Sequence, residues 1–196
     1  MKTAAALLAG VVAAVLASQA QAGMVTWHIP VTVNQETTAP AIPGGPTAVP
    51  AGVATITYDT STKMFTWDFM YAGLTGPATM AHIHGPAAPG SNASPIFSVI
   101  GTTAGVYGTG TPLTSDPWGG STGSVDFNAV ATFDSTTVSA LETELASGMM
   151  YLNLHTTMNP AGEIRGQIPA LPGNQIPEPA SLSLLALGGL ALLRRR

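Results

Sequence analysis

The sequence contains no cysteine and few basic residues, and each absence narrows the range of functions. Without cysteine the chain has no disulfide bonds, no thiolate metal ligands and no cysteine nucleophile. Between residues 23 and 175 only Lys63 and Arg165 are basic, against nine acidic residues, so this stretch has a net charge of −7. A chain without a basic patch cannot neutralise phosphates, and the sequence therefore predicts that nucleic acid is not a partner.

The first 22 residues predict export. Lys2 precedes an apolar run that ends at the small residues Ala20 and Ala22, which is the pattern of a signal peptide and its cleavage site. We therefore expect a signal helix over residues 1–22 that is removed after Ala22. A membrane anchor that stays on the protein is the alternative interpretation.

Residues 171–196 are predicted to be a linker followed by a three-part motif with an apolar helix over 180–193. The proline–glutamate triplet and the terminal arginines are Pro177, Glu178, Pro179, Arg194, Arg195 and Arg196. This order resembles the PEP-CTERM sorting signal of Gram-negative bacteria. The resemblance implies processing by an exosortase, transient anchoring in the inner membrane, and delivery to the cell surface or extracellular matrix, with exopolysaccharide as a candidate partner. A simple membrane anchor is the alternative, although the apolar run is shorter than the roughly 20 residues that a bilayer needs.

The stretch 23–170 is predicted to be one all-β domain, because short alternating segments are separated by turn residues. We expect an antiparallel β-sandwich with one short helix over 134–148, capped by Asp134 or Ser135 and ended by Gly148. Residues 102–123 are expected to form a long loop. The expected strands cover residues 24–33, 53–59, 64–72, 79–85, 95–101, 124–133, 149–156 and 164–168.

Two histidines in the segment 79–85 suggest a site. His82 and His84 lie two residues apart, so in a strand both point to the face that Met80 also occupies. His155 shares a face with Asn153 in the segment 149–156, whose opposite face is apolar and belongs to the core. If the two strands are neighbours, three imidazoles converge.

Imidazole is the usual ligand for zinc and copper, so the predicted metal ligands are His82, His84 and His155, with copper or zinc as candidate metals. Asn153, Glu163 and Arg165 are the predicted supporting residues, and Glu163, His28 or water could supply a fourth ligand. Two alternatives stay open at this point. The histidines could hydrogen-bond loop carbonyls without a metal, or one of them could act in acid–base catalysis.

Two blocks of sequence closely resemble the CHRD domain, which is named from the chordin family and occurs in many bacterial exported proteins. The blocks are "GLTGPATMAHIHGPAAPG" at 73–90 and "SGMMYLNLHTTMNPAGEIRGQI" at 147–168, and the resemblance spans Val25 to Ile168. It implies an exported domain but no particular ligand. The first block is also weakly similar to the copper-binding segment of copper–zinc superoxide dismutase, an immunoglobulin-like β-sandwich, which implies copper and a redox activity. The cysteine pair and the zinc ligands of that enzyme are missing here.

Other charged and aromatic residues are less informative. Glu163 and Arg165 are expected to form a salt-bridged or solvent-facing pair, with a buried role for Arg165 as the alternative. Three tryptophans are candidates for the core or for a sugar-stacking platform. No Gly-x-Ser-x-Gly element is present, so a hydrolase is not predicted, and the sequence leans toward a non-enzyme. The predicted function is an exported surface or matrix domain with a binding or structural role; the alternative is a copper- or zinc-binding domain with superoxide-dismutase-like redox activity.

Overall fold

The structure is a computed structural model that describes residues 23–42, 49–108 and 118–171. The predicted signal peptide, the sorting motif and its apolar helix over 180–193 lie outside the described residues. In the described ranges, no helix is both long enough and apolar enough to cross a membrane.

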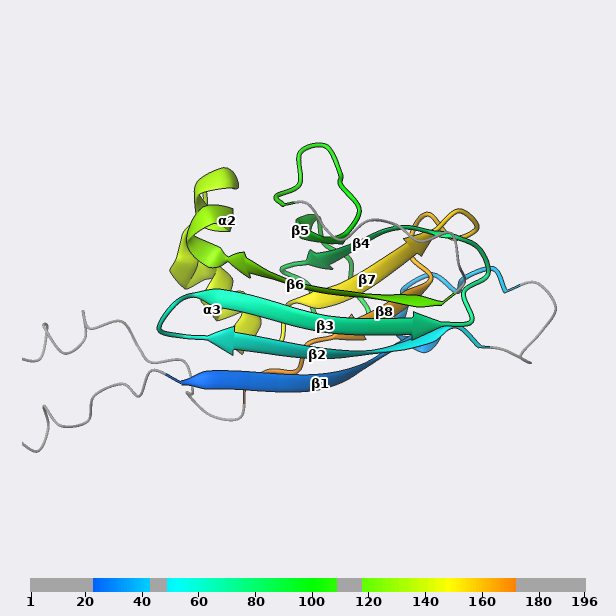
Figure 1. The fold of residues 1–196 in the computed structure, drawn as a ribbon, viewed down its shortest axis with the longest axis horizontal. Coiled ribbons are helices and arrows are strands. Elements are labelled where there is room, and N and C mark those ends of the chain that lie inside the picture. The colour runs from blue at the N-terminus through cyan, green and yellow to red at the C-terminus, as the bar shows by residue number, and fades with distance from the viewer. Residues whose placement is uncertain (1–22, 43–48, 109–117, 172–196) are drawn as a thin grey trace, which may run out of the picture. The chain divides into compact units, whose positions relative to one another are not determined.

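Eight strands in the described part form one antiparallel sheet, in the order β5-β4-β7-β8-β1-β2-β3-β6 (Figure 1). Two short α-helices, α2 and α3, lie together at one end of it. The elements are β1 (Met24–Thr32), η1 (Val33–Gln35), β2 (Ala51–Asp59), β3 (Met64–Ala72), β4 (Ala78–His84), β5 (Pro95–Ile100), β6 (Gly119–Asp126), α2 (Phe127–Phe133), α3 (Val138–Ala146), β7 (Tyr151–Thr156) and β8 (Ile164–Gln167).

The sheet folds over on itself, so that strands β6-β3-β2-β1 form one layer and β8-β7-β4-β5 form the other (Figure 1). The layers join where Thr32 of β1 pairs with Arg165 of β8. At the other side the two edge strands meet, because the Ser121 hydroxyl of β6 donates to the Val99 carbonyl of β5 at 2.8 Å. The prediction of an antiparallel all-β fold is confirmed, as a sheet that nearly closes.

Strand alternation sends large side chains into the space between the layers. In β1, Trp27, Ile29 and Val31 are buried while the residues between them are exposed. Across the layers, the rings of Phe65 and Phe97 meet edge to face with centroids 5.2 Å apart. This buried apolar contact is the main force that holds the domain together, since no disulfide is available.

The tryptophans do not form a common platform. Trp27 and Trp67 are 7% and 8% exposed and belong to the core, whereas Trp118 is 64% exposed. The Trp67 indole lies directly over Gly123 of β6, where an added Cβ would come within 2.4 Å of its Cζ2 atom. The expectation of a platform built from all three residues is therefore wrong.

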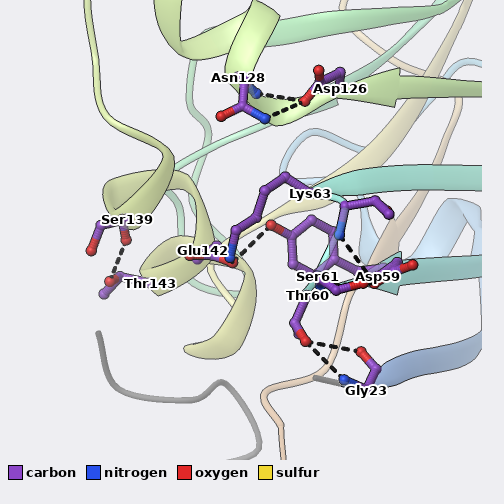
Figure 2. A network of polar contacts seen from close by, with 12 residues as sticks. Gly23, Asp59, Thr60, Ser61, Lys63, Asp126, Asn128, Ser139, Glu142 and Thr143 are labelled. Carbon is purple, nitrogen blue, oxygen red and sulfur yellow. Dashed lines mark hydrogen bonds and ion pairs between the residues drawn. The ribbon is translucent and has the colours of Figure 1, made fainter. Parts of the chain in front are cut away.

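The predicted strand 124–133 is wrong over its second half, where the chain forms α2. The Asp126 carboxylate accepts a hydrogen bond from the Asn128 amide at 2.9 Å and caps the helix (Figure 2). Phe127, Val130 and Ala131 are buried on one face at helical spacing. The domain therefore has two short helices where one was expected, and the predicted loop 102–123 already becomes strand β6 at Gly119.

The one helix predicted in the domain, over 134–148, is confirmed as α3, and Gly148 follows its end with a φ of 71°. Its N-cap is Thr137, whose hydroxyl accepts from the Ala140 amide, and not Asp134 or Ser135. The Glu142 carboxylate on this helix accepts from the Lys63 ammonium, at 2.8 Å, beside the β2–β3 turn (Figure 2). The ion pair ties α3 to the β2–β3 hairpin.

Candidate metal centre

The face of β4, β7 and β8 that points away from the core is polar, yet it is buried. All six residues of β7 are buried. Leu152 and Leu154, with Met150 just before the strand, face the apolar core, and the residues between them lie on the polar face. In the register of β4 and β7, His82 lies opposite Asn153 and Met80 lies opposite His155. These strands are therefore neighbours, which is the condition under which the sequence predicts that the three imidazoles converge.

Loops cover this polar face and hold the three imidazoles. The Ala93 carbonyl accepts from Nδ1 of His84 at 2.9 Å, and the Pro160 carbonyl accepts from Nδ1 of His155 at 3.1 Å. The Thr103 hydroxyl lies 2.8 Å from Nε2 of His82. Each ring therefore has one nitrogen tied to a different loop.

The three rings form a nearly equilateral group. Their centroids lie 5.5 Å apart for His82 and His84, 5.4 Å for His82 and His155, and 5.7 Å for His84 and His155. One nitrogen of each ring lies within 4.8 Å of the corresponding nitrogens of the other two. All three side chains are buried, with 2%, 7% and 7% of their surface exposed.

The hydrogen-bond partners determine which nitrogen of His84 and of His155 carries the proton. A carbonyl only accepts, so both residues must donate from Nδ1, and each keeps an unprotonated Nε2. At His82 the hydroxyl of Thr103 lies 2.8 Å from Nε2 and is able to donate or to accept. Among the described residues, no group hydrogen-bonds to Nδ1 of His82 or to Nε2 of His84 and His155.

Burial keeps the three imidazoles neutral near pH 7. It lowers the pKa of His82 and of His84 to about 4, helped by the neighbouring imidazoles, and Arg165 contributes at His84. Burial also lowers the pKa of His155, against the opposing effect of its bond to Pro160. Neutral imidazole is the form that binds a metal.

The arrangement fits a transition metal ion. Three imidazole nitrogens are a ligand set for zinc or copper, with metal–nitrogen distances of about 2.0–2.1 Å. Such an ion would draw the three nitrogens to within about 3.5 Å of one another, which the side chains can reach by small rotations from a spacing of at most 4.8 Å. The second nitrogen of each ring already has the carbonyl or hydroxyl partner that orients metal-binding histidines.

The two residues considered for a fourth ligand lie elsewhere. The Glu163 carboxylate accepts from the amide and hydroxyl of Thr75 at 2.6 and 2.7 Å, and from the side chains of Thr156 and Asn159. It therefore ties the β3–β4 loop to the end of β7 and to the β7–β8 loop. His28 is exposed on β1 and bonds to the Thr55 hydroxyl at 3.1 Å. Neither belongs to the converging group.

Arg165 supports the site from β8. It is 1% exposed, and its guanidinium lies 3.5 Å from the centroid of the Tyr151 ring. The same ring stacks on His84, with centroids 4.9 Å apart. In the described part of the chain Arg165 and Glu163 form no ion pair, and both are buried, so the expectation of a salt-bridged or solvent-facing pair is wrong.

Two further buried oxygen atoms lie beside Gly162 without a hydrogen-bond partner in the described part of the chain. Oδ1 of Asn153 and Oε1 of Glu36 are buried and have no hydrogen-bond partner in the described ranges. Both approach the position of a Cβ on Gly162, at 2.8 and 2.7 Å, and the φ of Gly162 is 135°, which favours glycine. Sequence reasoning missed Glu36 and Thr103, which come from other loops, whereas hydrogen bonds from the histidines to loop carbonyls were its metal-free alternative and are present at Ala93 and Pro160.

Comparison with family models matches residues 10–168 to the CHRD domain and residues 175–196 to the PEP-CTERM protein-sorting motif. No curated protein and no solved structure matches the chain. The sorting motif indicates export with transient membrane anchoring before processing by an exosortase. The similarity to superoxide dismutase stays a prediction. The three converging histidines and the two sequence blocks at 73–90 and 147–168 lie within the match at 10–168. The chain therefore belongs to the CHRD domain family.

Proposed function

We propose that this exported domain binds one transition metal ion, zinc or copper, through Nδ1 of His82 and Nε2 of His84 and His155. The observation that carries the proposal is the convergence of three buried imidazoles, which each offer one nitrogen within 4.8 Å of the others. Each ring also has one buried nitrogen without a hydrogen-bond partner among the described residues. A metal ion is the ligand that accepts three lone pairs at one point.

Metal uptake by the full-length protein tests the proposal. We expect one equivalent of Zn(II) or copper by isothermal titration and by elemental analysis after gel filtration. His155→Gln removes one ligand from the centre and should weaken binding at least a hundredfold. His28→Gln is the matched control, because His28 is exposed and bonds only to Thr55. Equal metal uptake by wild type and His155→Gln would contradict the proposal.

A binding or structural role at the cell surface or in the matrix is the second candidate. It is supported by the sorting motif and by apolar side chains on the outer face of the β6-β3-β2-β1 layer. Val53 and Met70 pair across β2 and β3 and are 63% and 62% exposed. Cosedimentation with exopolysaccharide from the producing cells tests this role, and Met70→Ser should weaken it if this face makes the contact.

A further inference from the structure

The charges around the centre carry an inference about its metal, which rests on the proposed function. We infer that the three-histidine centre takes copper as the cuprous ion, Cu(I), in preference to Cu(II) and Zn(II). Neutral ligands and a buried positive charge beside the centre disfavour the second charge of a divalent ion.

The ligands supply no negative charge. The three imidazoles are neutral, and no carboxylate belongs to the converging group in the described part of the chain. The nearest glutamate along the sequence, Glu163, hydrogen-bonds to Thr75, Thr156 and Asn159 and to none of the imidazoles. Moving an ion into a buried site costs more for a divalent than for a monovalent ion, because the cost rises steeply with charge.

Arg165 adds a positive charge that has only neutral partners. Its Nη1 donates to the Ser91 carbonyl at 2.8 Å and to Oδ1 of Asn92 at 3.3 Å, and its Nη2 donates to Oε1 of Gln167 at 2.8 Å. The remaining contact is the Tyr151 ring. No ion pair involving this guanidinium is found within the ranges that the structure describes.

The guanidinium is close enough to act on the metal. Strands β4 and β8 flank β7 on opposite sides, so the Tyr151 ring lies between Arg165 and His84. The two stacking distances, 3.5 and 4.9 Å, place the guanidinium within about 8.4 Å of the centre of the His84 ring. A metal on a nitrogen of this ring lies about 3 Å from that centre, so the guanidinium is at most about 11.5 Å from the metal. At that distance one added unit of charge on the metal lowers affinity roughly tenfold at an effective dielectric constant of about 20.

Glu36 does not fully cancel this charge. It interacts electrostatically with Arg165, but burial outweighs that attraction and raises the pKa of Glu36 from 4.5 to about 7. Near neutral pH the carboxyl group is therefore protonated in a large fraction of molecules. The face that contains the centre keeps a net positive charge before any metal binds.

Coordination number favours the same ion. Zn(II) in proteins is almost always four-coordinate, whereas three nitrogens satisfy Cu(I), a closed-shell ion that accepts trigonal coordination. Met80 also places a soft thioether beside the centre, because its sulfur accepts from the Thr103 hydroxyl that holds His82. Thioether and imidazole ligands together suit copper.

Three competition titrations of the full-length protein test the inference. Cu(I) is measured anaerobically against bicinchoninate, and Cu(II) and Zn(II) against chelators of known affinity at the same pH. We expect Cu(I) to bind at least tenfold more tightly than either divalent ion. Arg165→Gln, which keeps a hydrogen-bonding side chain but removes the charge, should narrow the ratio of Cu(I) to Cu(II) affinity at least tenfold, while His28→Gln leaves it unchanged.

The outcomes separate the inference from the proposed function. Binding of Zn(II) or Cu(II) as tightly as Cu(I) overturns the inference and leaves a metal-binding domain; binding of none of the three overturns both. If Arg165→Gln does not fold, Glu36→Gln serves at pH 8. Loss of that negative charge should increase the preference for Cu(I) several-fold, and a decrease would overturn the inference.

Discussion

Glu36 offers a test of the electrostatics that does not depend on any metal. Burial raises the pKa of its carboxyl group from 4.5 to about 7 in the folded protein, and Arg165 opposes this only in part. Between pH 4.5 and pH 7 the Glu36 carboxyl group holds a proton in the folded protein that it has released in the unfolded chain. The native protein therefore loses stability as the pH rises from about 4.5 to about 7, and the loss is complete above that range.

Glu36→Gln removes the titrating group, so the variant should gain stability relative to wild type as the pH rises. The full shift corresponds to about 3 kcal/mol, and because the side chain is only half-buried we expect about 2 kcal/mol. At pH 4.5 the two proteins should be nearly equal in stability, because the wild-type carboxyl group is then neutral in the native state.

Urea unfolding from pH 4.5 to 8.5 measures this difference, in the presence of a chelator and with the fluorescence of the buried Trp27 and Trp67 as the signal. An m-value of about 2 kcal/mol/M converts the expected gain to a midpoint shift of about 1 M. Both proteins keep all histidines, so their titration cancels in the comparison. Asp68→Asn, which removes a carboxyl group at an exposed site, is the control variant. A difference that stays constant or falls with pH would refute the electrostatic reasoning for Glu36.

Three further changes test the core, the loops and the centre. Gly123→Ala should lower the free energy of unfolding by about 1–3 kcal/mol in urea titrations, because the new Cβ would meet the Trp67 indole at 2.4 Å. Glu163→Gln should lower it by about 2–3 kcal/mol, and increase proteolysis of the loops, because one oxygen that accepts from Thr75 becomes a donor. Zinc affinity, measured by chelator competition, should change only a few-fold between pH 7 and 5 and fall as the pH approaches 4, because protons compete for His82 only near its pKa of about 4.

Much of the site follows from local rules that a sequence can express. Strand alternation places His82 and His84 on one face whatever the rest of the fold does, and the apolar pattern of the segment 149–156 puts His155 on the polar side. Predicting that β4 and β7 are neighbours needed more, because β5, β6 and both helices separate them along the chain. The sequence therefore predicted convergence only on the condition that these strands are neighbours, and the structure supplies that pairing.

The burial of the polar face was not predictable in this way. Hydrogen bonds to loop carbonyls were one alternative for the histidines, but a backbone carbonyl carries no residue-specific signal, so the sequence did not identify Ala93 as the partner of His84. Arg165 looked solvent-facing because arginine is rarely fully buried, and only the tertiary structure shows its aromatic and carbonyl partners. In the case of α2 a signal was present, since Asp126 caps a helix whose apolar residues also fit an alternating pattern.

The energetics of the three imidazoles discriminate between a metal centre and a metal-free network of hydrogen bonds. The loop contacts of His82, His84 and His155 account for one nitrogen of each ring and leave the other nitrogen of each ring without a partner in the part of the chain that the structure describes. Nε2 of His84 and Nε2 of His155 are acceptors, because Nδ1 of each ring donates to a carbonyl. Each buried acceptor without a partner costs about 1–3 kcal/mol, which is large beside the 5–15 kcal/mol by which a domain is stable. Two acceptors cannot bond to each other, whereas a metal ion accepts a lone pair from each ring. A single cation binds all three rings at once, which is why we favour a metal at this point over a purely structural role for the histidines.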